Sequence, residues 1–243
     1  MVDECELLAA MPAFETMGVH PTIVWRRGRP LIALRTEAER CRGLVFKRMF
    51  DVVVATAALV VLSPLLLVLA LAVLRGSPGP IIFGQPRAGR HGRFFRCLKF
   101  RSMYSDAEDR LRADKELYRK YVENDFKLPA DEDPRVTPVG RWLRRTSLDE
   151  LPQLFNVLTG DMSLVGPRPV IREELSHYAG DEPLLLLLRP GLTGWWQVNG
   201  RSSVPYPERK FMELEYVQTW TPLRDIEILL RTVPAVLRQR GAH

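Results

Sequence analysis

Cysteine and histidine are scarce in this chain, and neither is spaced to hold a metal. The three cysteines are odd in number and far apart, so they define no disulfide framework and fit a reducing environment. The four histidines form no H-x-x-x-H pair, which argues against zinc. Internal repeats and a low-complexity tail are absent, and the first residues lack the early apolar run of a signal peptide. Small disulfide-rich and zinc-finger classes are therefore excluded.

The composition points to one folded domain, with or without an appendage, that meets something anionic. The chain has 243 residues and a formal net charge of +6. Such a balance suits nucleic acid, anionic lipid or a phosphorylated substrate. Residues 1–46 read as a leader, with short strands expected at 23–25 and 31–34, and we assign this leader no role.

The most distinctive stretch is Val52–Leu74, 23 residues without a charge. As a straight helix it would be ~35 Å long, enough to cross a bilayer. Ser63 and Pro64 lie at its centre, where proline kinks a helix. Basic residues flank it on both sides, whereas a spanning helix shows an excess of lysine and arginine on one side only. The pattern predicts a re-entrant hairpin that enters one leaflet and turns at Ser63-Pro64. A plain spanning anchor with a tolerated proline is the alternative.

Several other segments carry weaker signals. Residues 94–101 alternate as a half-buried strand would, and present Arg96 and Lys99 either to phosphates or to lipid headgroups. Residues 105–124 predict one solvated surface helix with Ser105 as its N-cap. Residues 127–138 form a proline-punctuated loop, and 184–188 a short buried or interfacial helix.

The C-terminal stretch predicts an amphipathic helix that starts with Thr221 as cap and Pro222 as first residue. Its apolar residues recur at helical spacing opposite a basic face, which favours an in-plane interfacial helix over a core helix. Three tryptophans fit either a membrane aromatic belt or the core: Trp195, Trp196 and Trp220.

The strongest chemical signal is the run 144–156, followed by Gly166-Pro167-Arg168-Pro169. The paired N–H donors of arginine suit phosphate oxygens, and the adjacent carboxylates of Asp149 and Glu150 are candidate catalytic groups. Helix capping is an equally good explanation, because Ser147 and Glu150 have the spacing of a capping box. From the residues alone, chemistry and capping stay open.

A resemblance favours chemistry. Lys47-Arg48-x-x-Asp51, the apolar run with Ser63-Pro64, Lys99-Phe100-Arg101-Ser102-Met103, Ser147-Leu148-Asp149-Glu150-Leu151-Pro152-Gln153 and the Gly166–Pro169 motif occur in that order over about residues 46–240. Together they resemble the bacterial sugar transferases, monotopic polyprenyl-phosphate phosphoglycosyl transferases. The segment 189–201 is similar to members that initiate exopolysaccharide or O-antigen synthesis. Larger relatives carry extra transmembrane helices, so the chain resembles a minimal catalytic form with an unmatched leader.

The resemblance implies roles for particular residues. Asp149 would attack the β-phosphorus of a UDP-sugar, release UMP and form a covalent aspartyl intermediate, from which undecaprenyl phosphate takes the sugar phosphate. Mg²⁺ would bridge Asp149 and the diphosphate. Glu150 would assist that site or steer the acceptor. The implied phosphate and substrate ligands are Arg144, Arg168, Lys99, Arg101, Pro167, Gln197, Asn199 and Arg201.

We therefore expect an α+β, mostly helical chain: a leader (1–46), a re-entrant membrane helix (47–75) and a catalytic domain (76–243) with interfacial helices and a few short strands. It would lie in the bacterial inner membrane with its site on the cytoplasmic face, contact membrane lipid and no nucleic acid, and use UDP-glucose or UDP-galactose. A homodimer is compatible with this expectation.

Two rivals remain. A membrane-tethered basic protein that binds anionic lipid or nucleic acid would explain the charge but would not need Asp149 and Glu150. A conventional metal-dependent glycosyltransferase would release UDP instead of UMP.

Overall fold

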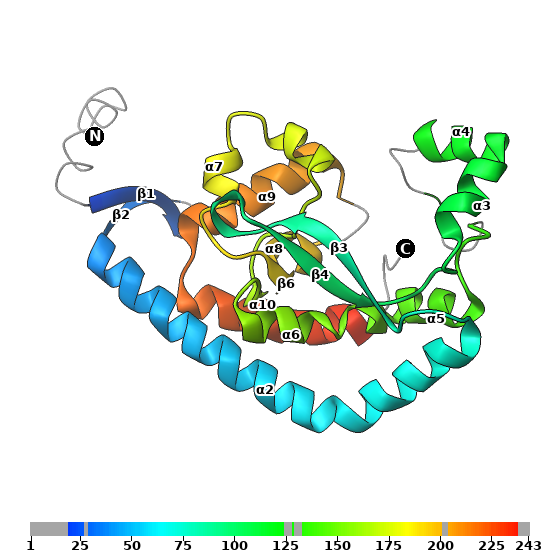
Figure 1. The fold of residues 1–243 in the computed structure, drawn as a ribbon. Helices are drawn as coiled ribbons and strands as arrows, with labels where there is room; N and C mark the ends of the chain where they lie inside the picture. Colours follow the sequence, from blue (N-terminus) through cyan, green and yellow to red (C-terminus); the bar gives the residue numbers. More distant parts are fainter. Residues whose placement is uncertain (1–18, 27–28, 124–127, 129–132, 201–203, 238–243) are drawn as a thin grey trace.

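The fold is known from a computed structural model of the chain, which describes residues 19–26, 29–123, 128, 133–200 and 204–237. It is mostly helical with three two-stranded sheets (Figure 1). The elements in order are β1 (Val19–Arg26), β2 (Arg29–Thr36), α2 (Glu37–Gly76), β3 (Ile82–Ala88), η1 (Arg90–Gly92), β4 (Phe94–Phe100), α3 (Ala107–Ala113), α4 (Lys115–Glu123), α5 (Pro138–Thr146), η2 (Leu148–Glu150), α6 (Gln153–Thr159), β5 (Ser163–Val165), η3 (Glu173–Tyr178), α7 (Glu182–Leu185), β6 (Gly191–Thr193), α8 (Trp195–Val198), α9 (Tyr206–Thr219) and α10 (Pro222–Leu237).

The apolar stretch forms the middle of α2, a single helix of 40 residues that starts well before Lys47. Figure 1 shows that α2 is bent near its middle, and that both of its arms rise toward the same side, where the rest of the protein lies. Pro64 is inside the helix, and a proline at that place removes a backbone hydrogen bond and accounts for the bend.

One face of α2 packs against the body and the other is bare. Ala55, Leu69 and Val73 are buried, and the helix contacts α5, α6, β5 and α10. On the opposite face Val53 is 66% exposed and Val61 75% exposed. Within the part of the chain that the structure describes, α2 is the one helix long and apolar enough to cross a membrane. A bare apolar face of this size needs a covering other than water.

Lys47 and Arg48, the basic residues closest to the start of the apolar run, turn toward the body of the protein. The Lys47 ammonium is buried and donates to Asp225 Oδ2 at 2.6 Å and to the carbonyl of Val165 at 2.8 Å. Asp51, one turn further on, accepts the backbone N–H of Leu164 at 3.1 Å. These contacts attach α2 to β5 and α10.

Arg48 attaches α2 to α6 in the same way. Its guanidinium donates to the carbonyls of Val157 at 2.5 Å and of Leu158 at 2.8 Å, in the last turn of α6. The last carbonyls of a helix have no partner within it, and a cation there is doubly favourable.

The β3–β4 hairpin lies against α6. Asn156 is buried in α6 and uses both ends of its amide on β4: its Nδ2 donates to the carbonyl of Arg96, and its Oδ1 accepts the N–H of Leu98. Lys99 follows directly in the strand. Its position relative to α6 is therefore fixed by the hydrogen bonds between the Asn156 side chain and the backbone of β4.

The surface helix expected over 105–124 is two helices, α3 and α4, with a break at Asp114. The Asp114 carboxylate accepts the N–H groups of Glu116 and Leu117, which makes it the N-cap of α4. Ser105 is not the cap of α3, because Asp106 occupies that position. Of the loop expected over 127–138, residues 128 and 133–138 are described, and the last of them, Pro138, is the first residue of α5; residues 127 and 129–132 lie outside the described part of the chain.

The C-terminal helix α10 has the expected start, since the Thr221 hydroxyl accepts the N–H of Arg224 at 3.0 Å. Leu223 is 77% exposed and Leu230 is 70% exposed on its apolar face. Trp196 and Trp220 are buried in the core, so the aromatic-belt interpretation is wrong for both. The short helix expected over 184–188 is α7 and the turn after it, with Leu185 and Leu188 buried.

The two strands expected in the leader are present, as the antiparallel pair β1–β2 with Ile23 opposite Ile32. The other leader residues, apart from the start of α2, lie outside the described part of the chain.

We expect Lys47→Met to lower the free energy of unfolding by about 3 kcal/mol, because it leaves the Asp225 carboxylate buried without its cation. Unfolding in detergent micelles, followed by circular dichroism, measures this. Lys120→Met is the matched control, since Lys120 pairs with Glu116 on the surface of α4 and its loss should change stability by less than about 1 kcal/mol. Equal effects of the two substitutions would contradict the anchoring role of Lys47.

Candidate active site

The two candidate carboxylates stand on a short 3₁₀ turn, η2, between α5 and α6. Ser147, just before them, has φ 57° and ψ 16°, and it ends α5 while its N–H donates to the carbonyls of Arg144 and Leu143. Its side chain makes no capping hydrogen bond, and Pro152 is the N-cap of α6. The capping box expected from Ser147 and Glu150 is therefore absent, and the two carboxylates need another explanation.

Lys99 on β4 is the partner of both carboxylates. Its ammonium lies 2.6 Å from Glu150 Oε1 and 4.0 Å from Asp149 Oδ2. Glu150 is partly open to solvent, whereas Asp149 is only 7% exposed. The lysine is thus committed mainly to Glu150, and the more deeply buried carboxylate has the weaker contact.

The environment of Asp149 opposes its ionisation. Burial, the largest cause, raises the pKa of Asp149 to about 6, and the neighbouring Glu150 adds to the rise. Lys99 and Arg144 act in the opposite direction on the same pKa. Asp149 at neutral pH is consequently a mostly ionised carboxylate with little hydration, a state that favours contact with a cation or an electrophile.

Glu150 has the opposite balance. Burial raises its pKa, but this is outweighed by Lys99, followed by Arg168 and Arg87, so that the pKa of Glu150 is below its ordinary value. Glu150 therefore stays charged and holds the Lys99 ammonium in place. The pKa values of the two adjacent acids are therefore shifted in opposite directions, as is common for neighbouring groups with different roles in a reaction.

Arg168 belongs to a loop that is fixed from both sides. The N–H of Gly166 donates to the carbonyl of Thr193, and the N–H of Gly191 donates to that of Pro167. A Cβ at Gly166 would lie 2.4 Å from the carbonyl oxygen of Arg189, so a side chain there would force the two segments apart. Pro167 itself is buried and acts through its backbone. The Gly-Pro-Arg-Pro motif thus has a structural part, Gly166 and Pro167, and a chemical part, Arg168.

The Arg168 guanidinium lies 5.7 Å from the Trp196 ring, and its Nε is buried without a hydrogen-bond partner in the described residues. Arg144 donates through Nε to the Ser102 hydroxyl at 2.8 Å and lies close enough to Asp149 to lower the pKa of that carboxyl. Arg168 beside Glu150 and Arg144 beside Asp149 give the carboxylate pair cations on either side.

Arg101 is not part of this arrangement. Its terminal nitrogens donate to the carbonyls of Ser77 at 2.5 Å and of Pro78 at 2.8 Å, so it closes the turn that follows α2. A Cβ at Gly79, where φ is +125°, would lie 2.0 Å from Arg101 Nη1. The geometry favours a structural role for Arg101 over the expected phosphate contact.

The expected ligands of the C-terminal motif separate in space. Gln197 on α8 has its Oε1 buried without a hydrogen-bond partner in the described residues. Asn199 is exposed and donates to the carbonyl of Trp195, while Arg231 of α10 lies 3.5 Å from its Oδ1. Arg201 lies outside the described residues. Asn199 therefore contacts α10 and not the carboxylates.

A buried group behind Arg168 was missed from the sequence. Glu213 on α9 is 1% exposed; it accepts the backbone N–H of Arg168 at 3.2 Å and a short hydrogen bond from the Tyr178 hydroxyl. Arg209 lies 3.5 Å from the same carboxylate, and Arg87 donates to the carbonyl of Pro169. A buried glutamate 45 positions from its partner leaves no local pattern in a sequence, so only the fold reveals that α9 supports the loop.

The side chains at this site could hold Mg²⁺ only together with oxygen atoms of a substrate, because they do not surround a metal ion by themselves. Among the described residues no three acidic, histidine or cysteine side chains gather around one point. Mg²⁺ commonly uses one or two carboxylates and fills its remaining positions with water and phosphate oxygens. Asp149, a buried carboxylate of raised pKa with only a loose contact to Lys99, has the oxygen atoms and the unbalanced charge for such a site.

A carboxylate pair with Lys99, Arg144 and Arg168 near it, on a body attached to an exposed apolar helix, suits an enzyme that acts on a phosphorylated substrate beside an apolar phase. The comparisons specify the class. The sequence model of the bacterial sugar transferases matches residues 42–239, and the chain belongs to that family.

Three characterised or named relatives show how similar the chain is. Over 98% of its length it is 42% identical to "Undecaprenyl-phosphate galactose phosphotransferase" of Salmonella typhimurium, of which it covers 51%. Over 94% it is 38% identical to "UDP-glucose:undecaprenyl-phosphate glucose-1-phosphate transferase" of Escherichia coli, of which it covers 48%. Over 87% it is 43% identical to "Exopolysaccharide production protein ExoY" of Sinorhizobium fredii, of which it covers 94%. The chain thus spans about half the length of the first two.

The raised pKa of Asp149 makes a stability prediction with a definite sign. Below the ordinary aspartate pKa both states carry the proton and the side chain has no effect; above about pH 6 the folded state bears the cost of an ionised, buried carboxylate. Asp149→Asn should therefore leave stability unchanged near pH 3.5 and raise the free energy of unfolding by about 2–3 kcal/mol at pH 8. Unfolding curves of the free protein at both values measure the difference.

Asp161→Asn is the control, because Asp161 is exposed and its substitution should change the free energy of unfolding by less than about 0.5 kcal/mol at either pH value. An Asp149 variant that is less stable than the parent at pH 8 would mean that the carboxylate stabilises the fold.

Proposed function

We propose that the protein transfers a sugar 1-phosphate from a UDP-sugar to undecaprenyl phosphate and releases UMP, as the first membrane step in the assembly of an exopolysaccharide or O-antigen. The observation that carries this proposal is the state of Asp149: buried, with a pKa raised to about 6, and lying between Lys99 and Arg144. Such a carboxylate is suited to attack an electrophile.

In the first step an Asp149 oxygen attacks the β-phosphorus of the donor. A bond forms between that oxygen and phosphorus, and the bond from the β-phosphorus to the bridging oxygen breaks. UMP leaves with this oxygen, and the sugar phosphate stays on Asp149 as an acyl phosphate. In the second step a phosphate oxygen of undecaprenyl phosphate attacks the same phosphorus and Asp149 leaves as a carboxylate.

An anionic nucleophile approaching an anionic diphosphate needs its charge offset, and the surrounding cations supply this. Lys99 lies 4.0 Å from Asp149 and Arg168 acts on Glu150, so the incoming phosphate would meet both cations. Because Glu150 holds Lys99 at 2.6 Å, its role in this proposal is to position the lysine. Mg²⁺ held by Asp149 and the diphosphate would supply further charge neutralisation.

The names of the relatives support the donor class. One relative is named for galactose transfer to undecaprenyl phosphate and another for UDP-glucose as donor. We therefore propose UDP-galactose or UDP-glucose.

We propose a position at the cytoplasmic face of the bacterial inner membrane; the exposed apolar face of α2 supports contact with a membrane. The phosphate of a polyprenyl acceptor lies at the membrane surface, so the site must be held at that depth. We propose that α2 is a re-entrant hairpin whose bare face lies in lipid and whose bend at Pro64 keeps both ends on one side. The exposed apolar face of α10, with Leu223 and Leu230, would lie in the interface beside it.

The nucleotide product tests the reaction. With Mg²⁺, UDP-galactose or UDP-glucose and undecaprenyl phosphate, chromatography should find UMP as the nucleotide released. Asp149→Asn should lower turnover by at least about 10³-fold, because the amide cannot form the covalent bond. Asp161→Asn is the control: it makes the same change at an exposed aspartate and should keep the parental rate.

Release of UDP would contradict the proposal and identify transfer of the sugar without its phosphate. Full turnover in Asp149→Asn would remove Asp149 from the chemistry.

The hairpin makes its own prediction. Single cysteines introduced at Arg42 and at Pro80, on either side of the apolar run, should react with a membrane-impermeant maleimide from the same side of sealed membrane vesicles. The native cysteines would first be replaced by serine. Labelling of the two positions from opposite sides would show that α2 spans the bilayer.

A further inference from the structure

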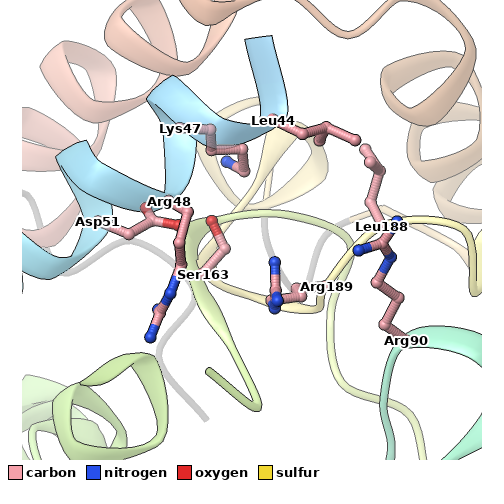
Figure 2. A pocket seen from close by; sticks show the side chains of 8 residues that line it. All are labelled: Leu44, Lys47, Arg48, Asp51, Arg90, Ser163, Leu188 and Arg189. Atoms are coloured by element: carbon pink, nitrogen blue, oxygen red, sulfur yellow. The ribbon is translucent and has the colours of Figure 1, made fainter. Parts of the chain in front are cut away.

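A cavity at the other end of α6 from Asp149 is lined by four cations and one acid. It is a narrow recess between α2, η1, β5 and the segment before β6; it is partly open to solvent, and its enclosed part has room for about one water molecule. Figure 2 shows the side chains that line it, among them Lys47, Arg48, Arg90 and Arg189, together with Asp51. Nothing in the chemistry proposed for Asp149 uses this cavity.

Most of the charges in the cavity already have partners. Lys47 is paired with Asp225, Arg48 has both terminal nitrogens on carbonyls of α6, and Asp51 accepts a backbone N–H. These groups are engaged in holding α2 against the body.

Arg90 and Arg189 differ from the other cations. Each donates only through Nε to a carbonyl, Arg90 to Leu187 at 3.0 Å and Arg189 to Gly160 at 2.7 Å. Among the described residues, no carboxylate lies within 4.0 Å of either guanidinium, and no hydrogen bond is made by their terminal nitrogens. Burial, followed by the proximity of Arg90 and then Arg48, lowers the pKa of Arg189. Asp51 and Asp161 act in the opposite direction on the same pKa, but within the described residues neither forms an ion pair with Arg90 or Arg189. Two like charges are thus held near each other with their outer N–H groups free, and an anion that accepts from both is favoured there.

The ligand that suits these donors, at the open mouth of the recess, is a phosphate group. Two guanidinium forks present planar pairs of N–H donors that match the oxygens of a phosphate. The cavity also has an apolar edge, because Leu44 and Leu188 line it beside the arginines (Figure 2). Cationic and apolar groups together suit a phosphate that carries a hydrocarbon part.

The place of the cavity indicates the source of that phosphate. It adjoins the turns of α2 where the bare apolar face begins, since Val45 is 63% exposed and Met49 is 64% exposed. The charged Arg42, one turn before, is exposed as well. A phospholipid headgroup would lie at this boundary between apolar and charged surface.

We propose that Arg90 and Arg189 bind the headgroup phosphate of an anionic phospholipid, at a site separate from the carboxylate pair. The bound phosphate would neutralise the two guanidinium ends and join the loop before β6 to the lipid beside α2. Because Arg189 also holds the carbonyl that ends α6, lipid at this site would stabilise the far end of the helix that follows Asp149.

Lipid titration of the protein in detergent micelles, without any UDP-sugar, tests the proposal independently of the reaction. Dioctanoyl phosphatidylglycerol, dioctanoyl phosphatidylcholine and inorganic phosphate are added separately, and the thermal unfolding midpoint is followed. Phosphatidylglycerol should stabilise the parent protein. Its apparent affinity should be about tenfold weaker in Arg90→Gln/Arg189→Gln, which removes both charge-assisted contacts.

The matched control is Arg110→Gln/Arg112→Gln, which removes the same charge from the exposed side of α3 and should change the affinity by less than about twofold. If the double variant fails to fold, the single variants Arg189→Lys and Arg90→Gln provide the test. The lysine should retain part of the response and Arg90→Gln should weaken it.

Equal affinity in the parent and the double variant, or in the parent and Arg90→Gln, would overturn the site. An equal loss of affinity in the α3 control would show that the lipid response depends on general surface charge and not on this site. Stabilisation by inorganic phosphate as strong as that by phosphatidylglycerol would overturn the lipid assignment in favour of a free anion.

Discussion

Helix α6 is held at its C-terminal end and in its middle, and the arrangement of the whole site depends on that. At its C-terminal end Arg48 of the apolar helix donates to the last carbonyls, and Arg189 donates to the carbonyl of Gly160 that follows. In its middle Asn156 fixes the strand that carries Lys99. Its N-terminal end follows the turn that bears Asp149. The membrane helix, the lysine and the candidate nucleophile are therefore positioned relative to one another by a single element of seven residues.

The same frame explains how two adjacent acids acquire different properties. Lys99, Arg168 of the Gly-Pro-Arg-Pro loop and Arg87 of β3 favour the charge of Glu150. Asp149 lies deeper, and burial dominates its pKa. Behind the loop, the buried Glu213 fixes the backbone of Arg168, so the support of the site reaches as far as α9. A buried, ionised Asp149 lowers stability, and proteins keep such groups where function uses them.

Local patterns in the sequence predicted the apolar helix, the bend at its proline, the two leader strands and the capped start of α10, because each depends on neighbouring residues alone. They failed where a distant partner decides the role. Lys47 and Arg48 have the appearance of a basic flank for lipid, but Asp225 and the end of α6 bind them. Ser147 and Glu150 match a capping box, yet Lys99 takes Glu150 and Ser147 adopts a left-handed turn. Arg90 and Arg189, 99 positions apart, meet only in the fold.

The central claim is that Asp149 forms a covalent bond to the β-phosphorus of the donor. Incubation of the protein with Mg²⁺ and UDP-galactose or UDP-glucose in the absence of acceptor, followed by rapid acid quenching, proteolysis and mass spectrometry, tests it directly. We predict a hexose-phosphate adduct on the peptide that contains Asp149, which disappears when undecaprenyl phosphate is added before quenching. An adduct on another residue, or UMP release that requires acceptor and leaves the peptide unmodified, would contradict the account.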